Sequence, residues 1–415
     1  MSPPVCHTGA PAYLAPTWYA FLLTGFYLYA VNVQGNVVPF LQAEFALSYR
    51  AVSLHSSAIA VGVILVGLLG DRVAAWLGRR RTLWLAVAGL AGGSILLCAA
   101  PPPPFGALPW ASIGACFLMG ALGALIPALL PALLADLHGA RLAEALAGQA
   151  IAAYVFGLAA PLVSGFAIWA GLGWRMAVLF GALSGIAIAL WYRKLPIVEG
   201  ARRAQAAQAQ PKKGGHLPAA FWAYWGLLIA SCALEFCILF WAPAFLERVI
   251  GFDAAAAATS AAGFPLGMLI GRIALRVLVR RVPLARLLAA ALALVFAGFL
   301  IYWGVGSELG IAPAAILGIF VIGLGVAPLY PLVTNFAIGA APASIPGARD
   351  LAAMRMAIAF GTALLLAPIA LGALADAAGL GPAHLALPAL ILAAYACFFA
   401  GRLLERRAAS LLPSA

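Results

Sequence analysis

Long runs of apolar residues, each ended by charged residues, proline or glycine, repeat along the whole chain. Each run approaches the roughly 20 residues that a helix needs to cross a hydrocarbon core about 30 Å thick. The pattern therefore predicts an all-α membrane protein. Its twelve predicted spans are 17–40, 51–70, 82–100, 110–134, 146–169, 174–192, 221–245, 255–278, 284–305, 311–336, 351–375 and 383–400.

One long polar interval divides these spans into six and six. Residues 193–218 are rich in alanine, glutamine, glycine and proline and carry several basic residues, a composition typical of a tether. We expect an N-terminal six-helix bundle at 1–192, a cytoplasmic linker at 193–218, and a C-terminal bundle with a short cytoplasmic tail at 219–415.

Composition supports a lipid environment and excludes a soluble domain. The chain is 65% hydrophobic and 9% charged, whereas soluble domains carry about 25% charged residues. The net charge of +12 does not indicate nucleic-acid binding, because the basic residues lie between apolar runs rather than on one aqueous face.

The positions of lysine and arginine predict the orientation in the membrane, because cytoplasmic loops hold an excess of both. With both termini in the cytoplasm of a cell, only Arg50, Arg175 and Arg248 fall outside cytoplasmic segments. Arg272 and Arg355 fall within spans. The sequence therefore predicts a multi-pass cell-membrane protein with cytoplasmic N- and C-termini.

The two halves repeat one another at an offset of 200 residues. Gly67 to Arg72 then aligns with Gly267 to Arg272, and Arg80-Arg81 aligns with Arg280-Arg281. Matches in order along both halves indicate duplication. Two related bundles can rock about a site held between them near the membrane midplane, which is the basis of alternating access.

The loop after the second span carries a recognisable motif. Gly67-Leu-Leu-Gly-Asp71-Arg72, followed by Gly78-Arg79-Arg80-Arg81, resembles the G-x-x-x-D-R-x-G-R-R signature of the major facilitator superfamily. The resemblance implies two pseudo-symmetric six-helix bundles and secondary transport. It also implies an ion-pair latch at the cytoplasmic side that steadies the outward-open state. The residues assigned to this gate are Gly67, Asp71, Arg72, Gly78, Arg79, Arg80 and, by the repeat, Arg272.

The motif departs from the family pattern in its spacing. Residues 73–77 stand where the family usually has one residue, and the four additional residues amount to about one helical turn. Because the addition is about one full turn, it would lengthen the helix end while the residues after it keep the same orientation. The family roles carry over to Arg79 and Arg80 less directly for this reason.

Proline and glycine in the fifth and eleventh spans suggest bending. Gly157 to Gly165, with Pro161 between them, resembles the glycine/proline motif of the family's exporters, and Pro368 occupies a similar place in the second half. Proline frees a carbonyl, and small residues let helices approach closely. We expect helix bending at Pro161, Gly165 and Pro368 and a slight preference for export. The fourth span lacks the arginine of proton-coupled drug exporters, which weakens that specific reading.

Glu235 is the acidic residue that falls halfway along a span, where an unpaired charge is costly and usually functional. We interpret it as a proton-coupling or substrate-binding site, with a structural, protonated or arginine-paired residue as the alternative. Arg355 would bind an anionic substrate group or pair with Glu235, unless its side chain reaches the cytoplasmic surface.

The first span is unusually polar because it contains Asn32, Gln34 and Asn36. Asn32 and Asn36 are four residues apart and share a helix face, which suits a central cavity or hydrogen bonds between helices. Four further residues are weaker candidates for the cavity: Gln149, Tyr154, Tyr330 and Asn335.

Sequence motifs of enzymes are absent. There is no phosphate-binding loop, no nucleophile elbow and no metal-ligand spacing, so no cofactor, metal or catalytic residue is expected. We expect a monomeric secondary transporter in the lipid bilayer, which moves a small-molecule substrate, an organic solute, with protons. The alternatives are an intramembrane transferase acting on lipid-linked substrates and a receptor that does not transport.

Overall fold

The computed structural model describes residues 14–104, 106–197, 217–342 and 348–410, and all regular structure among them is helical. The first half contains α1 (Leu14–Glu44), α2 (Tyr49–Leu77), α3 (Arg79–Ala99), α4 (Trp110–Gly123), α5 (Leu125–His138), the short helix η1 (Gly139–Arg141), α6 (Leu142–Trp169) and α7 (Trp174–Trp191). The second contains α9 (Ala219–Arg248), α10 (Ala254–Ser260), α11 (Gly263–Leu278), α12 (Leu284–Phe299), the π-helix η2 (Leu300–Glu308), α13 (Ala312–Val326), α14 (Leu329–Ala340), α15 (Ala348–Ala378), α16 (Leu380–Ala383) and α17 (Ala386–Ser410).

The twelve predicted spans are confirmed. Within the described ranges, eleven helical segments are long and apolar enough to cross a membrane. The twelfth span is α1, whose 31 residues include Asn32, Gln34 and Asn36, and these lower its hydropathy. Several helices extend past the predicted ends; α2, for example, continues from 70 to Leu77. A helix continues into the aqueous boundary because its hydrogen bonds do not depend on apolar side chains.

Three predicted spans are each broken into two helices. The breaks lie between α4 and α5, α10 and α11, and α13 and α14. Pro127, Pro265 and Pro331 follow these breaks within about one turn. Proline has no backbone N–H for the preceding turn, so the hydrogen-bond ladder is interrupted there. Each broken segment still provides a single candidate span, as predicted.

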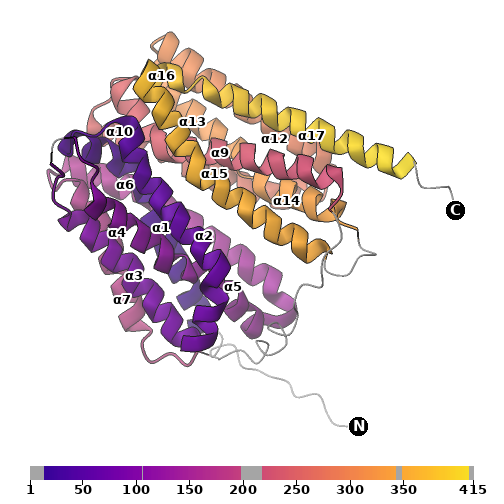
Figure 1. Cartoon of the computed structure of the whole chain (residues 1–415), viewed down its shortest axis with the longest axis horizontal. Helices are drawn as coiled ribbons and strands as arrows, with labels where there is room; N and C mark the ends of the chain where they lie inside the picture. The colour runs from indigo at the N-terminus through magenta and orange to yellow at the C-terminus, as the bar shows by residue number, and fades with distance from the viewer. Residues whose placement is uncertain (1–13, 105, 198–216, 343–347, 411–415) are drawn as a thin grey trace.

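The helices form two bundles, α1–α7 and α9–α17 (Figure 1). The bundles contact one another through α1 with α9, α2 with α15, and α6 with α10 and α11. We call the side where α1 begins and α17 ends the terminal side, and the opposite side the distal side. In Figure 1 the bundles meet near α10 on the distal side and diverge toward the chain ends.

Most of the predicted linker, 198–216, lies outside the described residues, as do 1–13 and 411–415.

Candidate functional site between the two bundles

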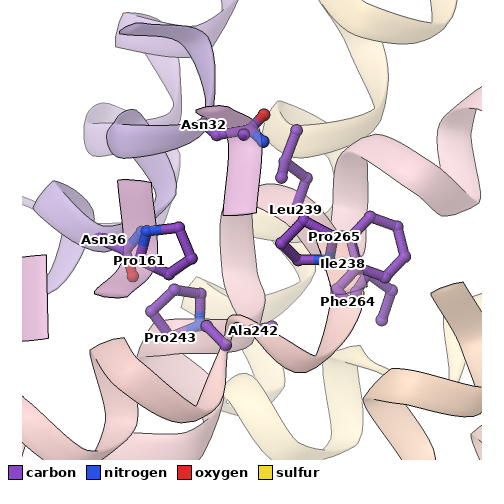
Figure 2. A pocket seen from close by; sticks show the side chains of 11 residues that line it. Asn32, Asn36, Pro161, Ile238, Leu239, Ala242, Pro243, Phe264 and Pro265 are labelled. Carbon is purple, nitrogen blue, oxygen red and sulfur yellow. The ribbon is translucent and has the colours of Figure 1, made fainter. Parts of the chain in front are cut away.

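A pocket lies where α1 and α6 face α9 and α11, and it contains about 280 Å³ of space between atoms (Figure 2). Asn32 and Asn36 of α1 and Pro161 of α6 line it from the first bundle. Leu239 of α9 and Pro265 of α11 line it from the second. The helix face that Asn32 and Asn36 share is therefore turned toward the junction of the two bundles. Their amides are the polar groups in a pocket wall that is otherwise apolar.

A second pocket lies beside the first and shares Leu239 with it. It contains about 370 Å³, and its wall includes Gln34, Ser56, Phe236 and Leu364. Both pockets lie between the bundles, so relative movement of the bundles would change the shape of both.

Between the two pockets, α1 and α9 touch backbone to backbone. A Cβ atom built on Gly35 would lie 2.2 Å from the carbonyl oxygen of Leu239. That carbonyl has no partner four residues ahead in its own helix, because Pro243 lacks the N–H. The lack of a side chain at Gly35 thus lets α1 pack directly against the Leu239 carbonyl that Pro243 leaves free.

A group of charged and phenolic side chains lies where the two bundles meet, about midway along α9. Glu235 is half-buried, midway along α9, and Arg272 of α11 is the charged group that acts electrostatically on its carboxyl. The guanidinium carbon of Arg272 lies 5.5 Å from the ring centroid of Tyr154, which belongs to α6 of the first bundle. Arg272, which the repeat assigns to the cytoplasmic gate, thus lies beside Glu235 and Tyr154 in this structure.

Aromatic residues extend this group within the second bundle. Tyr330 of α14 lies within electrostatic range of Glu235 and Arg272. Its ring centroid is 5.9 Å from that of Phe360, which in turn is 5.2 Å from that of Phe236. These rings connect the charged group to the second pocket, which Phe236 lines.

Four other predicted side chains are directed elsewhere, although Gln34 also lines the second pocket. Arg355 is exposed, and its backbone carbonyl accepts a hydrogen bond from the Trp225 indole at 2.8 Å. Asn335 is also exposed. The amides of Gln149 and Gln34 turn toward their own bundle; Gln149 Nε2 donates to Thr24 Oγ1 at 2.7 Å, and Gln34 contacts the sulfur atoms of Met119 and Cys116 at 3.8 Å. Arg272 is therefore a nearer electrostatic partner of Glu235 than the predicted Arg355.

The arginines of the motif after the second span make their contacts within the first half of the chain. Arg79 Nη1 forms an ion pair with Asp136 Oδ2 of α5 at 2.8 Å, and Arg80 donates to the carbonyl of Arg193. Asp71 and Arg72 lie exposed on α2, which continues for more than one turn beyond them. Residues 73–77, four more than the family pattern has here, therefore lengthen α2, as expected, and separate Asp71 from the arginine run.

Gly67 and Gly78 have different surroundings. No atom lies within 4 Å of a Cβ built on Gly67, whereas Gly78 has a φ of 79° and makes the turn between α2 and α3. A φ in this range suits glycine because other residues are strained there. Gly78 thus has a structural reason to be glycine.

The distal side is closed by contacts between the bundles. The Asp376 carboxylate of α15 accepts hydrogen bonds from the backbone N–H groups of Tyr49 and Arg50, at 2.7 and 2.9 Å, in the first turn of α2. Arg248 Nη1 of α9 donates to Gln42 Oε1 of α1 at 2.6 Å. An anion at a helix N-terminus is favourable because the N–H groups there are unsatisfied and carry partial positive charge.

Sequence reasoning missed this distal contact, although one signal was available. Arg248 is one of three basic residues that do not fit the predicted cytoplasmic location, and a second, Arg175, forms an ion pair with Glu44. Arg248 and Arg175 both lie on the side where basic residues are not expected, and each has a specific side-chain partner there. Asp376 carried no comparable signal, because its partners are backbone groups of a distant segment.

The predicted bending residues lie at helix contacts. Helix α6 is continuous through Pro161 and α15 through Pro368. The carbonyl of Pro368 accepts a hydrogen bond from the Trp241 indole at 3.1 Å. A Cβ built on Gly165 would lie 1.9 Å from Thr259 Oγ1 of the second bundle, so this glycine permits close distal packing.

The described residues contain no group of three His, Cys, Asp or Glu side chains placed to hold a metal ion.

Comparison with solved structures shows the same fold in known transporters. The nucleoside transporter NupG superposes with a TM-score of 0.71 and 13% identity, covering 95% of this chain and 99% of that one. A bacterial homologue of the human lysosomal transporter Spinster, inward-facing and occupied, gives 0.68 and 17%, covering 95% and 97%. The partially occluded, inward-open xylose transporter XylE from E. coli gives 0.71 and 15%, covering 92% and 96%.

A search of curated protein sequences found no match. The sequence does match the profile of the Major Facilitator Superfamily over residues 20–364. A match over most of the chain, together with two six-helix bundles, leaves one assignment: the chain belongs to the major facilitator superfamily.

Proposed function

We propose that the protein is a secondary active transporter that moves a small organic solute by alternating access, with proton coupling through Glu235. The observation that carries this proposal is the group formed by Glu235, Arg272 and Tyr154, which draws on both bundles midway across the membrane region. A carboxyl that can gain or lose a proton beside a cation, at the junction of two mobile bundles, couples protonation to their movement.

The proposed orientation places the terminal side in the cytoplasm of the cell, as the distribution of lysine and arginine favours. The closed distal side, held by Asp376 and Arg248, then faces outward. In this orientation the structure is an inward-facing state. The proposed moving units are the two bundles at 1–192 and 219–415, joined by the linker at 193–218, in a monomer.

The proposed preference for export rests on the glycine/proline motif of α6. Its Pro161 lines the central pocket, and its Gly165 packs against the second bundle. Bending of α6 would therefore act on the pocket and on the distal closure together. The assignment of export is tested by the direction of net flux under a proton gradient of either sign.

The experiment is transport by purified protein in liposomes. Labelled uridine, xylose and lactate represent a nucleoside, a sugar and an organic acid, and entrance counterflow identifies which of them crosses. For a transported solute, an imposed difference of one pH unit drives up to about tenfold accumulation if one proton is coupled. Glu235→Gln is expected to keep counterflow and to lose this accumulation.

Glu247→Gln is the matched control, because Glu247 lies on the same helix near its distal end. It is expected to behave as the wild type. Equal pH-driven accumulation by the wild type and by Glu235→Gln would contradict proton coupling through Glu235. Binding of a solute without counterflow would instead indicate a receptor.

A further inference from the structure

Arg272 is a half-buried cation whose hydrogen-bonding capacity is satisfied only in part, with Tyr154 as one partner. Its Nε atom is buried and has no hydrogen-bond partner among the residues that the structure describes. Among the described residues, no carboxylate oxygen lies within the 4.0 Å that defines an ion pair with its guanidinium. A guanidinium presents five N–H donors in a planar fork that matches a carboxylate. The fork thus lacks the anion that its geometry suits.

The groups that face this part of the site define its charge. Glu235 on α9 is the acidic group, Tyr154 of α6 and Tyr330 of α14 are phenols, and Cys232 is a thiol on α9. From α15, which also packs against α9, Arg355 is exposed. The site therefore holds one arginine and one carboxyl, and it is neutral when Glu235 is ionised.

We propose that the transported substrate is a small organic carboxylate, bound by Arg272 and carried together with a proton that Glu235 takes up. The inference rests on the proposed function and names its substrate class. Two carboxylates beside one guanidinium leave an excess negative charge in a weakly polar setting, which favours protonation of one of them. The site is thus neutral both when it is empty and when it holds substrate and proton.

Pro265, which lines the first pocket, lies about two turns before Arg272 on α11, and we assign the rest of the substrate to this pocket. Its wall is apolar apart from Asn32 and Asn36. Within the described part of the chain, the buried Asn36 Oδ1 has no hydrogen-bond partner. An unpaired buried acceptor is satisfied by a hydroxyl or amine of the ligand. The pocket is narrow in this state, which restricts the substrate to a small one. A short carboxylate with a hydroxyl group fits these features.

The test measures binding and proton uptake on the full-length protein in detergent. Lactate, glycolate and acetate are titrated into weakly buffered protein while a pH indicator records protons taken up. We expect binding of lactate with uptake of a proton by the wild type, and binding without uptake by Glu235→Gln. We also expect Arg272→Gln to weaken binding at least about tenfold, because a charge-assisted pair is lost.

Two variants separate a binding role from a structural one. Arg272→Lys keeps the charge and is expected to restore part of the affinity. Arg276→Gln removes an exposed arginine one turn further along α11 and is expected to bind lactate as the wild type does. If Arg272→Gln elutes as aggregate in size-exclusion chromatography, Arg272→Lys and the proton-uptake comparison with Glu235→Gln still decide the proposal.

Three results would overturn the proposal: no binding of any carboxylate, unchanged affinity in Arg272→Gln, or binding by the wild type without proton uptake. Counterflow of uridine or xylose but of no carboxylate would leave the transporter assignment standing and overturn the substrate class. Carboxylate binding without counterflow of any solute would overturn the transporter assignment and leave only a carboxylate-binding site at Arg272.

Discussion

Removing the charge of Asp376 is expected to open the distal side. In Asp376→Asn the carboxylate no longer complements the N-terminus of α2, where it accepts two backbone hydrogen bonds at 2.7 and 2.9 Å. A charge at an exposed helix N-terminus contributes about 0.3–1 kcal/mol, and loss of a capping oxygen costs about 0.5–2 kcal/mol. Asparagine retains one acceptor, so we expect a change of about 1–2 kcal/mol, or roughly 5–30-fold in the ratio of distal-closed to distal-open molecules.

The assay is a distance measurement across the distal side by pulsed electron paramagnetic resonance. Spin labels are attached at Leu172→Cys and Leu309→Cys, two exposed positions on different bundles, after replacement of the native cysteines. We expect a longer-distance population to grow in Asp376→Asn. Because the group is exposed, high salt should reduce the difference between the variant and the parent protein.

Glu308→Gln is the control, since Glu308 is another exposed carboxylate on the distal side. It is expected to leave the distance distribution unchanged. The same distribution in Asp376→Asn as in the parent would refute the assignment of Asp376 as a contact that holds the distal side closed. An equal shift in Glu308→Gln would show that net distal charge, rather than this contact, sets the equilibrium.

Two further changes test packing and pairing. Gly35→Ala places a methyl group 2.2 Å from the Leu239 carbonyl, and the overpacking of about 1–3 kcal/mol should disfavour the distal-closed state and slow counterflow. The control Gly92→Ala, whose methyl group meets no atom within 4 Å, should keep the parent rate. Equal counterflow rates in the two variants would contradict this role of Gly35. Asp136→Asn removes the charge that pairs with the nearly buried Arg79 and should lower the stability of the first bundle by about 1–3 kcal/mol, seen as a lower unfolding temperature. Asp71→Asn should have little effect, and an equal loss in both variants would argue against the Arg79–Asp136 pair.

The membrane fold was predictable because lipid imposes a strict requirement on each segment separately. A helix that satisfies its own backbone hydrogen bonds and presents apolar side chains can be recognised without knowing its neighbours. All twelve spans, including the unusually polar α1, were found in this way. The breaks at Pro127, Pro265 and Pro331 were missed because a proline can either interrupt or merely bend a helix, depending on how neighbouring groups satisfy the freed carbonyl.

The sequence by itself also determined that Glu235 lies in mid-membrane and that Asn32 and Asn36 share a face, because both follow from position and periodicity within one helix. Only the tertiary structure decided that Arg272 and Tyr154 join Glu235, that Arg79 pairs with Asp136, and that Asp376 caps α2. These contacts join helices far apart in the chain. The rotation and depth of each helix relative to the others depend on packing of the whole bundle, which the periodicity of a single helix does not specify.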